Sequence, residues 1–245
     1  MWFIDSWSLG YFHWMFDALP RLFAVKFLLE ECIVILPEAY RKQDYITSSL
    51  KLIGVKEMHY IEEGEFLYIK QLYSPSLTAP TGNYNDSLVL KMREYFINFL
   101  PKKNDLNFGN KIYISRRKAT RRRIENEDEL IAVIETYGFK VVIFESYTWL
   151  EQASIMLNAE FLLSNHGAGL SNMVFMKPEC SVFELRKEGD VGNNCFFSLA
   201  SALNLKYYYQ TCNAINLTND DHAANLIVDC DKLKVNLDIM MNKGK

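Results

Sequence analysis

Short apolar segments alternate with amphipathic segments over residues 111–210, and this alternation constrains the fold more than any other feature. The predicted strands are 111–115, 141–144, 161–164, 182–185 and 206–210, and the predicted helices are 126–137, 148–158, 168–176 and 194–203. Strands that alternate with helices at this spacing form a parallel sheet covered on both faces. We therefore predict an α/β fold, with a further helix over 220–241 at the end of the chain.

The first 100 residues follow a similar pattern less regularly. Helices are predicted over 11–30, 42–53 and 86–100, and strands over 32–36, 58–61 and 66–72. Pro20 must kink or restart the first helix, because proline lacks the N–H that the helix needs. The polar segment 101–110 contains Pro and Gly and is the predicted linker. Two domains follow, 1–104 and 105–245. Residues 1–4 resemble the middle of a buried strand, so we expect an N-terminal sheet that is incomplete.

Composition excludes several classes of protein. The 245 residues are 49% hydrophobic, which is enough for a packed core, and the net charge of -3 gives no overall basic field for nucleic acid. No run of 18 apolar residues is present to span a membrane, and no secretory signal is recognisable. The five cysteines form no C-x-x-C pair. Such an odd, scattered set fits reduced thiols, and we predict a cytoplasmic location, at most peripheral at the inner membrane face.

The first candidate site lies where the strand 161–164 gives way to the helix 168–176. The residues there are Asn165, His166, Gly167, Ala168 and Gly169. A helix start after a parallel strand presents unpaired N–H groups and a partial positive charge, which suit a diphosphate. Glycine lets the backbone approach a ligand closely, and a neutral histidine can donate to a phosphate or sugar oxygen. The alternative is a tight turn whose small residues serve packing.

The second candidate site is the loop after the strand 111–115. Six of the eight residues at 116–123 are Lys or Arg, and they include Arg116, Arg117 and Arg123. The forked guanidinium group matches phosphate oxygens, and the loop follows the carboxyl end of a strand as the first site does. The alternative is a solvated basic loop.

Two further features carry carboxylates. His13 and Asp17 are four residues apart, so they share one helix face, and the carboxylate can orient the imidazole as a general base. Glu184, near the end of the strand 182–185, can accept hydrogen bonds from ribose hydroxyls. The alternatives are a structural His–Asp pair and a partner for Arg186 or for the basic loop. H-x-x-x-D lacks a third ligand, so a metal site is poorly supported.

Taken together, these segments resemble glycosyltransferase family 61, whose bacterial members include capsular polysaccharide biosynthesis proteins. The segments that carry the resemblance are 11–22 (YFHWMFDALPRL), 111–117 (KIYISRR), 123–127 (RIENE), 144–145 (FE), 150–152 (LEQ), 165–176 (NHGAGLSNMVFM) and 182–185 (VFEL). Their order and spacing make the set specific, although each piece alone is weak. Family members usually have more sequence before the segment at 11–22.

The resemblance implies a GT-B fold, with two Rossmann-like domains of parallel sheets and the N-terminal one incomplete here. It implies transfer from a UDP-sugar to a saccharide acceptor, with inversion and without an obligate metal or other cofactor. Arg116, Arg123 and the turn from His166 to Gly169 would hold the diphosphate, with Arg117 and Asn165 beside them. Asn172 and Glu184 would be further donor contacts. His13 or Asp17 would be the acceptor base. Apolar surface left by a missing sheet half could drive homodimerisation.

Two other functions are compatible with the same sequence features. A Rossmann oxidoreductase or epimerase would need G-x-G-x-x-G after the first strand, whereas only G-x-G is present, after the third strand of its half. A non-catalytic nucleotide- or sugar-binding module of a polysaccharide assembly would use the same loops without turning a ligand over.

Overall fold

The computed structural model describes residues 1–100, 106, 108–215 and 223–242. It shows a mixed α/β protein with two compact units, Met1–Pro101 with Thr148–Leu150 and Lys102–Tyr147 with Glu151–Lys245. The assignment of acceptor and donor roles to 1–104 and 105–245 stays a prediction. Among the described residues, no helix is long and apolar enough to cross a membrane.

The second unit is built on a six-stranded sheet in the order β4-β3-β5-β6-β7-β8. The strands are β3 (Lys111–Ile114), β4 (Lys140–Val142), β5 (Phe161–Asn165), β6 (Ser181–Lys187), β7 (Lys206–Ile215) and β8 (Asn225–Ile227). All neighbours are parallel except β7 and β8, which are antiparallel. The predicted parallel sheet is confirmed for β3 to β7.

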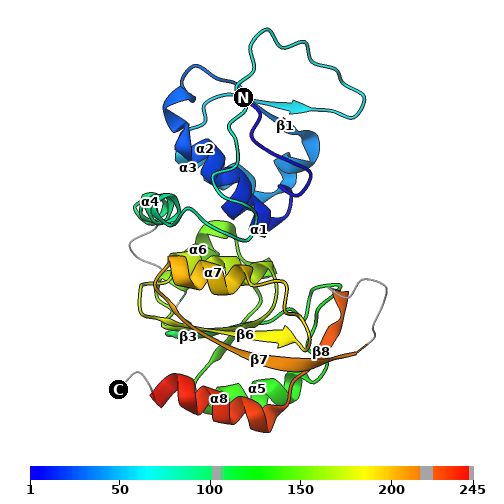
Figure 1. Cartoon of the computed structure of the whole chain (residues 1–245), viewed down its shortest axis with the longest axis vertical. Coiled ribbons are helices and arrows are strands. Elements are labelled where there is room, and N and C mark those ends of the chain that lie inside the picture. The colour runs from blue at the N-terminus through cyan, green and yellow to red at the C-terminus, as the bar shows by residue number, and fades with distance from the viewer. Residues whose placement is uncertain (101–105, 107, 216–222, 243–245) are drawn as a thin grey trace. The chain divides into compact units, whose positions relative to one another are not determined.

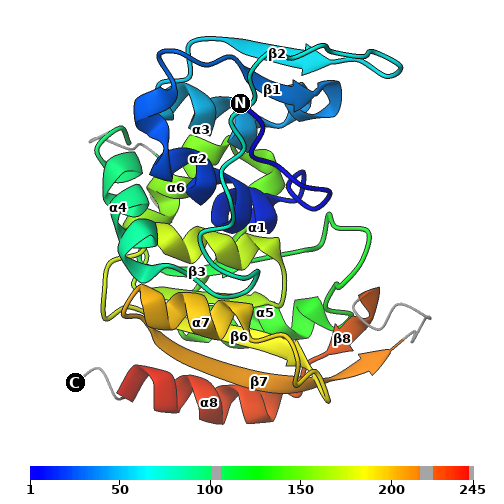
Figure 2. The ribbon, with the colours of Figure 1, turned by 45° about the horizontal axis from the view of Figure 1, so that its top comes forward.

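Helices cover both faces of this sheet. Figures 1 and 2 show α5 (Glu127–Thr136) and α8 (Cys230–Asn242) on one face and α7 (Cys195–Ala202) on the other. The core between the sheet and the first two helices contains Tyr113, Leu130, Ile134, Leu163, Phe183, Leu185, Leu233 and Leu237. Side chains alternate along a strand. Phe183 and Leu185 therefore face this core, while Glu184 and Arg186 point to the face that carries α7.

The segment after Gly167 is a 3-10 helix, η5 (Ala168–Phe175), where the sequence pattern predicted an ordinary helix. It packs against β5 and α7. The side chain of Asn172 donates to the Gly169 carbonyl three residues earlier at 3.3 Å, a local bond that competes with regular helical pairing. Two shorter helical segments complete the unit, η4 (Phe144–Ser146) and the end of α6 (Trp149–Leu157).

The prediction of a continuous helix over 220–241 is wrong for the part that the structure describes. Residues 225–227 form β8, and the helix α8 begins only at Cys230. Leu226 is buried while Ile227 is 41% exposed, the two-residue alternation of a strand. Residues 220–222 lie outside the described residues.

β8 and its flanks are bonded to the basic loop after β3, about 100 positions earlier. The N–H of Leu226 donates to the Arg123 carbonyl at 2.8 Å, and the Glu125 N–H donates to the Leu226 carbonyl at 2.9 Å. The Asn126 side chain exchanges hydrogen bonds with the backbone of Val228 at 2.9 and 3.0 Å. The far end of the basic loop is therefore fixed by the C-terminal part of the chain.

The first unit has a smaller sheet, the parallel pair β1 (Val34–Pro37) and β2 (Met58–Ile61). Its helices are α1 (Tyr11–His13), α2 (Leu19–Ala24), α3 (Asp44–Ile53) and α4 (Asp86–Ile97), and short helical segments lie at η1 (Trp14–Ala18), η2 (Lys26–Leu28) and η3 (Glu38–Lys42). α3 ends at Gly54, whose left-handed φ of 96° is typical of a glycine that terminates a helix. The described residues of this unit contain no complete Rossmann-like sheet.

Two predicted strands of the first unit are absent. Residues 66–72 have no regular structure, and Phe66 and Tyr68 are 95% and 91% exposed. These apolar side chains have no neighbouring strand to pack against, and strand formation depends on such packing. Residues 1–4 are not a strand either, although the Ile35 N–H donates to the Met1 carbonyl at 3.1 Å, which places this segment beside β1.

Pro20 shapes the helix that carries His13 and Asp17. The predicted interruption appears as a π-helical turn, η1, between α1 and α2, in which the Leu19 N–H donates to the Trp14 carbonyl five residues earlier. Proline has no N–H to donate, and its ring would clash with the carbonyl four residues back. A wider turn removes the need for that bond, and such π-bulges are frequent at functional sites.

Candidate functional site

A pocket opens in the second unit at the carboxyl ends of β5 and β6, where open α/β sheets bind ligands. Its empty volume is about 680 Å³, the space open to solvent included, and its lining comprises Arg122, Asn165, His166, Lys187, Gly189, Asp190, Val191, Gly192, Ala224 and Leu226. Asn165 and His166 were predicted from the sequence. Arg122 and Lys187 bring positive charge, and Asp190 brings one carboxylate.

Arg116 lies directly against Gly167. A Cβ at position 167 would come within 2.6 Å of Arg116 Nη1, so a larger residue there would displace the guanidinium. The guanidinium also donates to the Arg122 and Arg121 carbonyls, at 3.2 Å each. Burial lowers the pKa of Arg116, an effect that Glu145 opposes, but a guanidinium remains charged. The basic loop thus folds back onto the end of β5.

Arg122 holds the turn of the basic loop in an uncommon backbone conformation. Its φ is 56°, in the left-handed region that residues with side chains seldom adopt. The Arg122 carbonyl accepts hydrogen bonds from Arg116 Nε and from the Asn165 side-chain amide. Asn165 is buried, and its side-chain oxygen has no hydrogen-bond partner within the described ranges. Strained backbone of this kind gathers at ligand clamps.

His166 is held from both sides of its ring. Nδ1 bonds the buried Glu184 carboxylate, and Nε2 lies 3.0 Å from the Asn193 side-chain amide. The other Glu184 oxygen accepts from the Tyr207 hydroxyl. The ring of Phe196 meets the imidazole edge-on, with 5.1 Å between centroids. Glu184 therefore serves His166 rather than facing the pocket itself.

Arg186 fixes the loop that follows β6. Its guanidinium is buried and donates to the carbonyls of Asp190 and Asn193, at 3.0 and 2.6 Å, and to the Asn194 side chain at 3.0 Å. These bonds hold residues 189–193 as one wall of the pocket and bring Asn193 to His166.

Of the ten predicted donor-site residues, Asn165 and His166 line the pocket and eight do not, and three of the eight are bonded to other parts of the unit. Arg117 is bound to Glu127 at 2.9 Å and to Asp128 at 2.7 Å. Arg123 is exposed, with its backbone bonded to Asn225 and Leu226. Asn172 is buried in η5 and donates to Gln152 at 3.3 Å. Of the two remaining residues, Ala168 begins η5, and a Cβ at Gly169 would come within 3.2 Å of Ile114.

The structure adds four residues that the sequence analysis did not select. They are Arg122, Lys187, Asn193 and Tyr207. A signal existed for two of them, because Lys187 and Asn193 belong to a Gly-containing polar segment directly after a predicted strand, where pockets form. Tyr207 lies in a later strand, and no motif marks it.

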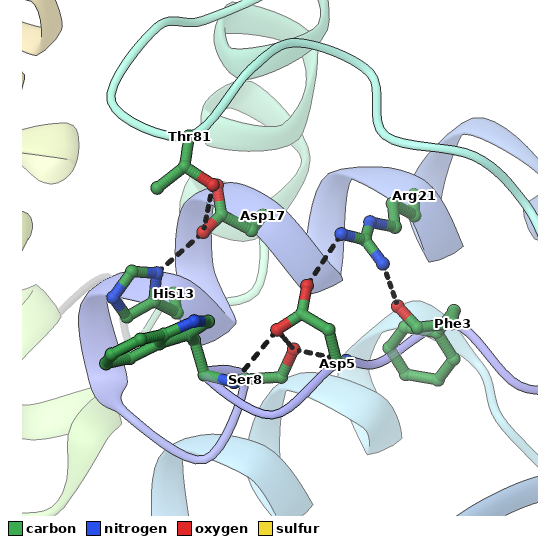
Figure 3. Close-up of polar contacts among 8 residues, drawn as sticks. Phe3, Asp5, Ser8, His13, Asp17, Arg21 and Thr81 are labelled. Carbon is green, nitrogen blue, oxygen red and sulfur yellow. Dashed lines mark hydrogen bonds and ion pairs between the residues drawn. The ribbon is translucent and has the colours of Figure 1, made fainter.

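His13 and Asp17 form a pair in the first unit, as their spacing predicted. His13 Nδ1 lies 2.7 Å from Asp17 Oδ2, the Asp17 side chain is 3% exposed and the imidazole is 26% exposed. Thr81 donates to the same carboxylate oxygen at 3.3 Å (Figure 3), and 5.6 Å separates the centroids of the Trp7 ring and the imidazole. A buried carboxylate that orients a partly exposed imidazole is an arrangement suited to a general base.

Asp5 ties the N-terminal segment to α2 beside this pair (Figure 3). Its carboxylate accepts from Arg21 at 2.8 Å, from the Trp7 N–H at 3.0 Å and from the Ser8 hydroxyl at 3.0 Å. Burial raises the pKa of Asp5, but these hydrogen bonds outweigh it and leave the pKa below its usual value.

The lowered pKa of Asp5 predicts an acid-dependent contribution to stability. A carboxyl with a lowered folded-state pKa stabilises the fold above its unfolded pKa of about 3.9, and the contribution is lost as pH falls through the folded value. We expect Asp5→Asn to lower the urea midpoint at pH 7 more than at pH 3. An equal difference at both pH values would mean that the charge of Asp5 contributes nothing.

Within the described ranges, no group of three or more His, Cys, Asp or Glu side chains is placed to hold a metal ion. Transfer without a metal stays a prediction. All five cysteines are free thiols.

Comparison with known proteins agrees with the resemblance seen in the sequence. Among curated proteins, the chain is similar to the EGF domain-specific O-linked N-acetylglucosamine transferases of several animals. It is 35% identical to the Drosophila melanogaster enzyme over 98 residues, which are 39% of the chain and 18% of that enzyme. It is 27% identical to the Bos taurus enzyme over 173 residues, which are 67% of the chain and 32% of that enzyme. The matched parts thus span a fifth to a third of these relatives.

The family model described as Glycosyltransferase 61 matches residues 11–183. This match includes the His13–Asp17 pair, the basic loop and the turn at Gly167, and it ends one residue before Glu184. The chain belongs to the glycosyltransferase 61 family.

Proposed function

We propose that this protein transfers a sugar from a UDP-sugar to a saccharide acceptor, with inversion and without an obligate metal. Family membership and the names of the relatives support a glycosyltransferase. The observation that carries the donor assignment is the contact of Arg116 with Gly167 at the end of β5. It puts a guanidinium group beside the pocket that Asn165, His166, Arg122 and Lys187 line.

The donor diphosphate is proposed to lie in this pocket. Arg116 and Arg122 come from the loop after β3, and Lys187 ends β6. The first N–H groups of η5 come from the segment after β5. Fixed positive groups stabilise the charge that develops as UDP leaves, and they are already in place before the reaction. The exposed Arg117 and Arg123 add at most a long-range field that salt screens.

The acceptor hydroxyl is proposed to lose its proton to His13, oriented by Asp17. The acceptor oxygen then attacks the anomeric carbon, the bond from that carbon to the diphosphate oxygen breaks, and UDP departs with the electron pair. A single displacement of this kind inverts the anomeric centre. It assigns the acceptor to the first unit and the donor to the second, as in the GT-B fold that the resemblance implies.

The relatives' names refer to N-acetylglucosamine, so UDP-N-acetylglucosamine is the first donor to test. We propose capsular or other surface polysaccharide synthesis as the role and keep the cytoplasm as the location. The acceptor named for the relatives, an EGF domain, is the alternative acceptor class to include in the assay.

UDP is expected to raise the melting temperature, and Arg116→Ala is expected to abolish the rise. Free ligand at 100 times its Kd adds about 2.7 kcal/mol to the unfolding free energy. The matched control is Arg117→Ala, which removes a neighbouring arginine that Glu127 and Asp128 hold away from the pocket. Differential scanning fluorimetry measures all three proteins. No shift at millimolar UDP, or an equal loss in both variants, would contradict the donor site.

A donor screen separates transfer from binding alone. UDP release is measured over several UDP-sugars, with a saccharide or an EGF domain as acceptor. Release with one donor supports the transferase, whereas UDP binding without any release supports the non-catalytic module. A purified protein that carries nicotinamide absorbance would instead support the oxidoreductase or epimerase.

A further inference from the structure

Side chains from β6, from β7 and from the loop after β6 surround His166. Glu184 on β6 is 1% exposed, and both of its carboxylate oxygens are used. One oxygen bonds His166 Nδ1, and the other accepts from the hydroxyl of Tyr207 on β7. On the opposite edge of the imidazole, Nε2 meets Asn193 from the loop that Arg186 fixes.

The chemistry of these partners assigns the ring protons. Burial and the Glu184 carboxylate raise the pKa of Tyr207 far above its usual value, so the phenol keeps its proton and donates it. A carboxylate without a proton can only accept, so Nδ1 must donate to Glu184. With Nδ1 donating, Nε2 carries the ring's lone pair, which lies 3.0 Å from the Asn193 amide nitrogen and can accept from it.

We propose that Tyr207 is a positioning residue that acts through Glu184 to keep His166 neutral, with its proton on Nδ1 and its Nε2 lone pair turned to the 189–193 loop. The effect on catalysis rests on the proposed donor site, whereas the effect on the ring does not. In this form both ring nitrogens are occupied, Nδ1 by Glu184 and Nε2 by Asn193. His166 then has no N–H to offer a phosphate oxygen, contrary to the donor role expected from the sequence.

The surrounding charges set the balance between imidazole and imidazolium. Around the pair lie Glu184 and Arg186 on β6, Tyr207 on β7 and Cys195 at the start of α7. Lys187, Asp190 and Arg122 line the same pocket, and Arg116 lies against Gly167. The cations disfavour an imidazolium. The carboxylate favours one, and the hydrogen bond from Tyr207 weakens that effect by drawing on the carboxylate charge.

The hydroxyl of Tyr207 can be removed with little change in packing. Its ring lies 5.5 Å from the ring of Phe197 and 6.3 Å from that of Tyr209. These aromatic contacts remain in Tyr207→Phe, so the variant removes only the hydrogen bonds of the hydroxyl, to Glu184 and to Arg186. Tyr209→Phe is the matched control, because it removes a hydroxyl from the next residue on the same face, which is 58% exposed.

The test is a pH titration of the imidazole nitrogens by NMR on the full, ¹⁵N-labelled chain. The chain has four histidines, and His166→Gln assigns the signal. The native protein is expected to show the Nδ1–H form at pH 7. Tyr207→Phe is expected to raise the titration midpoint of His166, since the carboxylate becomes more basic. Tyr209→Phe is expected to leave the midpoint unchanged.

Two further measurements test the same role of Tyr207. If Tyr207→Phe does not fold, Glu184→Gln replaces it, and loss of the Nδ1–H signature is expected because an amide can donate to Nδ1. In the transferase assay, Tyr207→Phe is expected to raise the donor KM several-fold at an unchanged melting temperature. An Nε2–H form in the native protein, or an unmoved midpoint in Tyr207→Phe, overturns the inference. Failure of UDP to bind overturns the donor site and leaves the NMR result intact.

Discussion

Replacing His13 by alanine is expected to lower the rate of sugar transfer by about 10²–10⁴-fold, the usual contribution of a positioned general base. The imidazole is the group in the first unit best placed to take a proton, because the buried Asp17 carboxylate holds Nδ1 at 2.7 Å and the ring is partly exposed. The loss is expected in kcat, with the UDP-induced rise in melting temperature unchanged.

The first unit offers a matched control for this experiment. His59 also bonds a carboxylate, Glu65, at 3.0 Å, but both side chains are largely exposed and belong to β2 and the turn after it. His59→Ala is expected to leave the transfer rate within a factor of two. Equal rates in His13→Ala and the native protein would remove His13 as the base, and a lost UDP shift in that variant would indicate misfolding instead.

Replacing Glu127 by alanine is expected to lower the unfolding free energy by about 3–5 kcal/mol, the cost of breaking a buried charged cluster. Glu127, at the start of α5, accepts from the hydroxyls of Tyr113 at 2.8 Å and Ser115 at 2.7 Å and from Arg117 at 2.9 Å. Burial and the Glu127 charge raise the pKa of Tyr113 well above its usual value. The variant leaves both hydroxyls buried without this acceptor.

Urea unfolding of Glu127→Ala and Asp128→Ala measures this difference. Asp128 bonds the same arginine from a position that is 94% exposed. Surface ion pairs contribute about 0–1 kcal/mol, so Asp128→Ala is expected to lie within that range. A loss below 1 kcal/mol in Glu127→Ala would show that water satisfies the two hydroxyls.

The sequence predicts the sheet of the second unit well because strands that are buried on both faces are rich in apolar residues. β3 and β5 each contain three consecutive apolar residues, apolar residues flank Glu184 in β6, and the predicted helices between the strands keep a 3.6-residue period. The same rule misleads at residues 66–72, whose apolar side chains are exposed. It also misses β8, because three residues are too few to show a period against the adjoining helix.

The candidate site was predictable only where local sequence decides the geometry. The turn at Gly167 and the His13–Asp17 spacing are local, and the structure has both the turn after β5 and the His13–Asp17 bond. Local sequence does not determine the direction in which each arginine points. Arg116 and Arg117 are adjacent, yet one meets Gly167 and the other meets Glu127, which depends on the helix start after the loop. Tyr207 reaches Glu184 only through the pairing of β6 with β7.

The bonds that join the basic loop to β8 also bear on the order in which the chain acquires its structure. Arg123 and Glu125 are fixed by residues about 100 positions later, and closing so long a segment is entropically costly before other contacts support it. Contacts of such high sequence separation form slowly. We therefore expect the pocket's cationic wall to form only after β8 has docked, so that ligand binding follows a late step in the folding of the second unit.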